Sequence, residues 1–141
     1  MADAAAKAAK VEGLERLRAK LLKMTGPQAQ AAMLKANTRS ASEFEALVRQ
    51  IVPQGDEERG HLVDTLRQTS RGATGVEVSI GDKGNPYPAH LELGHKARDG
   101  SHVPGLAFWF PAKRVTKKKA HGRIVRAERA AIKQIMGGAN G

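Results

Sequence analysis

The sequence predicts an α+β fold in which a small antiparallel sheet packs against a long N-terminal helix, a second helix and a C-terminal helix. Two observations carry this prediction. Apolar residues recur at helical spacing in the first third of the chain and again near its end. Between these regions, strict alternation of apolar and polar residues indicates a strand. The 141 residues suffice for one domain, which we place at 11–136, with flexible tails at 1–10 and 137–141.

Three helices are expected, over about 11–24, 27–51 and 121–136. The first presents one apolar face, formed by Val11, Leu14, Leu17, Leu21 and Met24. Pro27 suits the first turn of the second helix, where its missing N–H costs nothing. We expect these two helices to pack as a hairpin. The third helix places Ile124, Ala127, Ala131 and Ile135 inward.

Three strands are expected, over about 76–80, 87–93 and 106–110. The first alternates most clearly, with two valines and an isoleucine on one face. We expect it to pair with 87–93 as an antiparallel hairpin. The third holds two phenylalanines and the only tryptophan, and is expected to pack on the helices. The stretch 61–67 is compatible with a helical turn or with the start of a strand. Residues 94–105 are expected to form a loop, and a loop of this length often has a function.

The composition excludes several classes of protein. Cysteine is absent, so the chain has no disulfides and no thiolate chemistry. Hydrophobic residues make up 40% and aromatic residues 4%, which predicts a modest aliphatic core. No apolar run approaches the roughly 20 residues that cross a bilayer. The first residues lack the apolar block of a secretory signal. We therefore expect a soluble protein without a membrane partner.

The positive charge is concentrated in the last third of the chain. The formal net charge is +10, from 24 basic and 14 acidic residues. Residues 1–94 carry 13 basic and 12 acidic side chains, whereas residues 95–141 carry 11 and 2. Such asymmetry favours a polyanionic neighbour, either nucleic acid or an acidic protein surface. A solvated basic tail is the alternative.

Histidines and aromatic residues offer weaker signals. His90, Glu92 and His95 are the basis of one alternative, a small metal-dependent nuclease, but His-Glu-x-x-His is absent. Exposed loop histidines are the simpler interpretation. We therefore predict no catalytic residues, no metal and no cofactor. Phe108 and Phe110 are assigned to the core, whereas Trp109 is placed at an interface.

The order of the short motifs is more informative than any one of them. After the two helices comes His61-Leu62-Val63-Asp64-Thr65-Leu66-Arg67 and then a strand. The stretch Tyr87-Pro88-Ala89-His90-Leu91-Glu92-Leu93-Gly94 follows, with a Tyr-x-Ala-x-x-Glu-x-Gly pattern. A loop leads to Phe108-Trp109-Phe110-Pro111-Ala112 and a final helix. Over roughly residues 10–136 this arrangement resembles the tail-completion, or tail-terminator, family of long-tailed double-stranded DNA phages, prophages and gene transfer agents. The chain differs from the family at Pro88, at His95 and in its basic loop.

The resemblance implies a structural virion protein without catalysis. Such subunits form a ring, typically a hexamer, at the head–tail junction. The ring terminates the tail tube and joins it to the head-side connector or stopper, and the genomic double-stranded DNA passes through its lumen without sequence readout. The implied partners are further copies of the chain, the tail tube protein and the connector. The implied location is the virion, with assembly in the host cytoplasm.

Candidate site residues follow from the resemblance and from the charge. For the ring or connector interface they are Tyr87, Glu92, Gly94, Trp109 and Pro111. For a basic surface that faces the lumen or a partner they are Lys96, Arg98, Lys113, Arg114, Lys117, Lys118 and Lys119. Exposed edges of the predicted strands are candidates for sheet continuation between neighbours. A basic, sequence-nonspecific DNA-binding accessory protein is the main alternative function.

Overall fold

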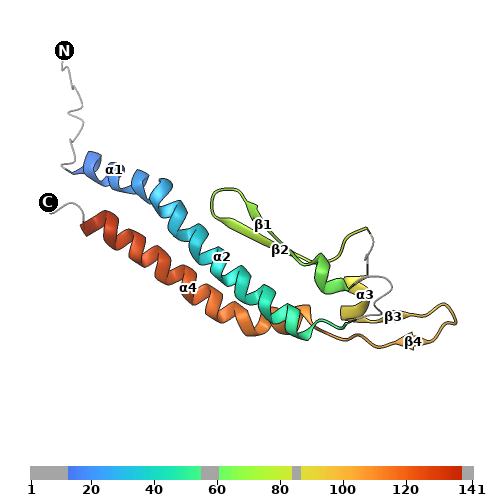
Figure 1. Cartoon of the computed structure of the whole chain (residues 1–141). Helices are drawn as coiled ribbons and strands as arrows, with labels where there is room; N and C mark the ends of the chain where they lie inside the picture. The colour runs from blue at the N-terminus through green and yellow to red at the C-terminus, as the bar shows by residue number, and fades with distance from the viewer. Residues whose placement is uncertain (1–12, 55–60, 84–86, 138–141) are drawn as a thin grey trace, which may run out of the picture.

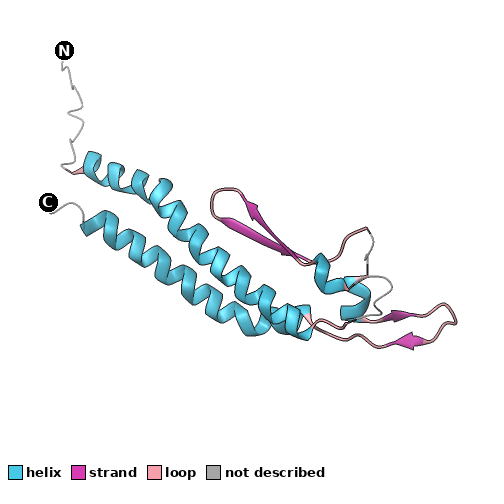
Figure 2. Cartoon of the chain, viewed as in Figure 1, coloured by secondary structure: helices cyan, strands magenta, loops and turns pink. Residues whose placement is uncertain are grey.

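The computed structural model describes residues 13–54, 61–83 and 87–137, and it confirms the α+β class. The elements in chain order are α1 (Leu14–Met24), α2 (Pro27–Ile51), a 3-10 turn (Leu62–Thr65), β1 (Arg67–Arg71), β2 (Gly75–Ser79), α3 (Pro88–Leu93), β3 (His95–Lys96), β4 (His102–Val103) and α4 (Trp109–Gly137). Figure 2 shows that helices dominate and that the strands form two small hairpins.

The molecule is elongated because α1 and α2 follow one another as a single bent helix, with α4 antiparallel beside them (Figure 1). The predicted packing of the first two helices as a hairpin is wrong. Only Thr25 and Gly26 separate them. The Gly26 N–H donates to the Lys23 carbonyl at 3.1 Å, and the Gln30 N–H donates to the Gly26 carbonyl at 3.0 Å. Helical hydrogen bonding thus nearly continues through the junction, which bends the chain without reversing it.

The principal helix pair is α2 with α4. Small side chains let the two helices approach closely: Ala29, Ala36 and Ala41 of α2 are buried, and so is Ala112 of α4. The predicted inward stripe of the last helix is confirmed, since its four residues between 124 and 135 are all half-buried.

The predicted strand at 76–80 is confirmed as β2, but its partner is not 87–93. It pairs with β1 in an antiparallel hairpin whose register runs from Arg67↔Ser79 to Arg71↔Gly75. Gly72, with φ 64°, supplies the left-handed conformation of the turn. All five residues of β1 are exposed, so this strand lacks the apolar alternation that marks β2.

Neither of the other two predicted strands forms: 87–93 is mostly helical, whereas 106–108 has no regular secondary structure and 109–110 open the last helix. Residues 88–93 form α3, which begins at Pro88, and α4 begins at Trp109 instead of at 121. Pro111 does not prevent this early start, because the first N–H groups of a helix have no intrahelical partner to lose. The predicted loop at 94–105 contains β3 and β4, which form a second hairpin, hereafter the arm, with His95 opposite Val103.

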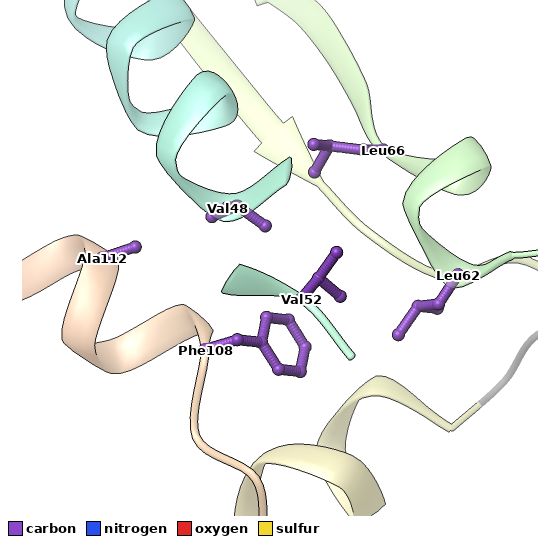
Figure 3. Close-up of a cluster of buried hydrophobic side chains, with 6 residues drawn as sticks. All are labelled: Val48, Val52, Leu62, Leu66, Phe108 and Ala112. Carbon is purple, nitrogen blue, oxygen red and sulfur yellow. The ribbon is translucent and has the colours of Figure 1, made fainter. Parts of the chain in front are cut away.

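The core lies where α2 ends, the 3-10 turn packs and α4 begins. Figure 3 shows its six side chains, which converge from these three elements. They are Val48, Val52, Leu62, Leu66, Phe108 and Ala112. Of these, Val48 and Phe108 are the largest fully buried side chains. Phe108 therefore occupies the core, as predicted, whereas Phe110 is 49% exposed and does not.

Candidate interaction surfaces

A buried carboxylate holds the start of α4. One oxygen of Glu92 accepts hydrogen bonds from the N–H groups of Phe108 at 2.7 Å and Trp109 at 2.8 Å, and the other accepts from Phe110 at 3.0 Å. Glu92 is 8% exposed. Burial by itself raises its pKa, but the three N–H donors together outweigh burial and the pKa is lowered. The helix dipole adds to the same preference for an ionised side chain.

Two glycines, Gly94 and Gly105, allow the two ends of the arm to contact one another closely at its base. Gly94 has φ 80°, and a Cβ there would lie 2.6 Å from the Val103 carbonyl oxygen and 2.8 Å from the Gly105 nitrogen. A Cβ on Gly105 would collide with the Glu92 carbonyl oxygen. The Leu106 N–H donates to the Leu91 carbonyl at 2.7 Å. The Glu-x-Gly stretch thus closes the arm and clamps it to α4, so Glu92 and Gly94 contact their own chain.

The remaining three interface candidates lie nearer the surface. Tyr87 is 56% exposed, whereas Pro111 is half-buried. Trp109 is also half-buried and contacts the Phe44 ring of α2 in a T-shaped arrangement, with a ring-centroid distance of 4.8 Å and an interplanar angle of 88°. Trp109 thus packs on α2 within its own chain, and it also lines the open groove between β2 and α4.

The proposed nuclease triad is not assembled as a metal site. The rings of His90 and His95 lie 5.6 Å apart in a T-shaped arrangement. The Glu92 carboxylate is bonded instead to the three amides of α4. Within residues 13–54, 61–83 and 87–137, no group of three or more His, Asp or Glu side chains is arranged to hold a metal ion.

The predicted basic residues divide into two groups in the structure. Lys96 and Arg98 lie on the arm, and the other five lie on the first half of α4. Lys119 is engaged within the chain: its Nζ lies 3.3 Å from a Glu43 carboxylate oxygen of α2. The other four on α4 are exposed and have no ion pair with another described residue. They are Lys113, Arg114, Lys117 and Lys118.

Glu43 forms a cross-helix cluster that the sequence did not reveal. Arg123 of α4 donates to Glu43 at 2.7 Å and to the Ser40 hydroxyl at 2.8 Å. Arg39 approaches Glu43 less closely, at 3.9 Å. The hydrogen bond from Arg123 is the main cause of a lowered Glu43 pKa. Because 80 residues separate Glu43 from Arg123, no local spacing could have signalled this pair.

An open groove of about 690 Å³ lies between β2, α2 and α4, hereafter the β2–α4 groove. Its apolar walls come from Ala41, Phe44, Val76, Val78, Trp109 and Ile124. Lys113, Lys117 and His121, one helical turn apart on α4, also line it. Among the described residues, no acidic side chain lines the groove. Arg114 and Lys118, one position further along, lie outside it.

Large apolar side chains also lie on the outside of the molecule. Leu22 is 64% exposed, and Leu93 and Val115 are each 71% exposed. On α1, three members of the predicted apolar face are uncovered, with Leu17 51%, Leu21 54% and Met24 38% exposed, whereas Val11 lies outside the described residues. Four of the nine buried hydrophobic residues, by contrast, are alanines. The described part of the chain therefore buries little apolar surface relative to what it leaves in contact with water.

Comparison with protein-family models, curated proteins and solved structures gives no match to this chain. Among the residues that the structure describes, no helix is both long and apolar enough to span a membrane.

Proposed function

We propose that this chain is a structural virion protein that forms a ring at the head–tail junction of a long-tailed phage or related particle. In this role it ends the tail tube and joins the tail to the head connector, while the DNA passes through the lumen. The ring is proposed to contain six copies. The proposal combines the order of the motifs in the sequence with the unusual distribution of apolar side chains.

The observation that carries the proposal is the uncovered apolar surface of an elongated chain with a thin core. Contiguous exposed apolar surface is characteristic of interaction sites. The exposed leucines Leu17, Leu21 and Leu22 belong to α1, at one end of the helical part of the molecule, whereas Leu93 belongs to α3, which lies beside the opposite end, where α2 ends and α4 begins (Figure 1). Two different exposed apolar surfaces on one chain favour head-to-tail contacts between copies. Such contacts close into a ring when the rotation between neighbouring subunits allows it.

The test is the mass of the protein in solution, measured by light scattering on a sizing column at low and high salt. We expect an assembly of six 15.1 kDa chains that persists at high salt, because apolar contacts are not screened. Leu21→Gln/Leu22→Gln should reduce the assembly to monomers. The matched control is Arg16→Gln/Lys23→Gln, which changes two other exposed residues of α1 and should leave the ring intact.

A monomer at every concentration, with no binding to tail tubes, would contradict the ring. The basic surface of α4 favours the second candidate, a sequence-nonspecific DNA-binding accessory protein. Its signature is a shift of duplex DNA whose affinity falls steeply with added salt. Strong attraction to DNA would hinder passage of a genome through a lumen, so tight duplex binding by a monomer would support the accessory protein and count against the ring.

A further inference from the structure

The β2–α4 groove combines three features of a peptide-binding site. Its walls are apolar, it is open along one side, and its cationic side chains have no ion pair with another described residue. Of the first hairpin, β2 lines the groove and β1 does not. β2 reaches the groove through Gly75, Val76 and Val78, and within the described residues its edge away from β1 has no strand partner. An unpaired strand edge presents N–H and C=O groups to any extended chain beside it.

We propose that the β2–α4 groove binds an extended acidic segment of a different protein, which adds as a third strand to the free edge of β2. Alternate side chains of a strand point to opposite faces. An apolar side chain at every second position would therefore face the apolar walls at Phe44 and Trp109. The acidic side chains between them would face outward at the rim, where the long, exposed side chains of Lys113 and Lys117 can turn toward them. Backbone pairing supplies affinity, and the apolar and charged contacts select the sequence.

Charge identifies the occupant as another protein and not a second copy. The chain carries a net charge of +10, so two copies repel one another near this basic rim. Several described acidic residues are already committed within the chain: Glu43 to Arg123, Glu77 to Arg71 and Glu92 to the start of α4. The apolar walls also distinguish the groove from a DNA-binding surface, because phosphate contacts need cations and not valines. This inference does not depend on ring formation.

The experiment uses Trp109 as its reporter. It is the only tryptophan in the chain and lines the groove. The probe is an octapeptide of alternating Glu and Val with blocked ends, titrated while tryptophan emission is followed. We expect saturable binding and a change in emission. A peptide with Lys in place of Glu, and an acidic peptide with a central proline that cannot pair with a strand, should both bind at least about tenfold more weakly.

Two double variants distinguish the groove from the general charge of α4. Lys113→Glu/Lys117→Glu should weaken binding of the acidic peptide by about tenfold or more. Arg114→Glu/Lys118→Glu makes the same change of charge on the same helix outside the groove, and should change the affinity by less than about threefold. Both variants should give circular dichroism spectra like that of the unaltered protein, because all four side chains are exposed.

Three results would overturn the proposal. The first is the absence of peptide binding at millimolar concentration. The second is an equal loss in both double variants, which would indicate a diffuse polyanion surface. The third is tighter binding of duplex DNA than of the peptide together with sensitivity to both double variants, which would assign this face to nucleic acid. None of these results depends on the oligomeric state, so the peptide-binding proposal and the ring proposal are tested independently.

Discussion

Among single residues, Glu92 has the clearest structural role, and it explains why a glutamate precedes the arm. Its ionised carboxylate binds three amides that would otherwise be unsatisfied at the start of α4. The sequence singled out this glutamate through the resemblance, but as an interface residue. Its internal role was hidden because the start of α4 was placed twelve residues too late, at 121 instead of at Trp109.

Replacing Glu92 should destabilise the protein in a pH-dependent way. We expect Glu92→Ala to lower the free energy of unfolding by about 2–3 kcal/mol, since buried N–H donors lose their acceptor, and Glu92→Gln by about 1–2 kcal/mol. The folded-state pKa lies below the ordinary value of 4.5, so the stabilising effect of the charge is present above pH 4.5 and is lost as the pH falls further.

Urea denaturation at neutral pH and at about pH 3 measures this effect. The difference between the unaltered protein and Glu92→Gln should be largest at neutral pH and should shrink in acid. Glu128→Gln, an exposed change on α4, serves as the control and should have little effect at either pH. A difference that is the same at both pH values would contradict a role for the charge.

Gly94 is the second residue for which a single substitution should matter. An alanine there must adopt φ near 80° and place its Cβ against the Val103 carbonyl and the Gly105 nitrogen. We expect Gly94→Ala to lower the free energy of unfolding by more than about 2 kcal/mol. Gly100→Ala at the tip of the arm is the comparison, because it is strained in φ but has open space around it, and it should cost less than Gly94→Ala.

At the level of elements, the sequence predicted helices better than strands. The second helix agrees with α2 over its whole length, because a long periodic segment ended by Pro53 leaves few alternatives. The strand at 76–80 was found through its alternation. Its partner β1 was missed because both of its faces are exposed, so no hydrophobic period exists to detect. The short apolar stretches at 87–93 and 106–110 suited either a strand or a helix.

The α2–α4 pair should depend on Arg123 more than on its neighbours. Arg123 is the most buried of the three cations around Glu43, with 12% of its side chain exposed, and it also binds Ser40. We expect Arg123→Ala to lower the melting temperature clearly, and Arg39→Ala, whose side chain is 75% exposed, to have almost no effect.

Calorimetry at neutral pH measures both variants. Because the Glu43 pKa is lowered, chiefly by the Arg123 hydrogen bond, the contribution of the pair is present above pH 4.5 and is lost below it. Equal melting temperatures for Arg123→Ala and the unaltered protein would show that apolar contacts alone hold α2 and α4 together.

On the scale of the whole molecule, stability should depend on assembly. In the proposed ring, a chain with a thin core and exposed leucines would gain its remaining apolar burial from neighbouring copies. We therefore expect the melting temperature to rise with protein concentration, because association favours the folded state by mass action. Differential scanning fluorimetry over a hundredfold range of concentration measures this. In Leu21→Gln/Leu22→Gln the dependence should disappear, whereas a flat response in the unaltered protein would argue against self-association.

The closed base of the arm allows the sequence of the arm to change while the rest of the fold stays the same. Because Gly94 and Gly105 meet, the chain leaves the scaffold and returns to it at adjacent points. The ten residues between them can therefore be shortened, lengthened or exchanged as a cassette, and the entropic cost of closing a longer loop grows only slowly with its length. The length of the arm and the side chains at its tip can thus change to suit a new neighbour, while α2, α4 and the hydrogen bonds of Glu92 to the start of α4 remain unchanged.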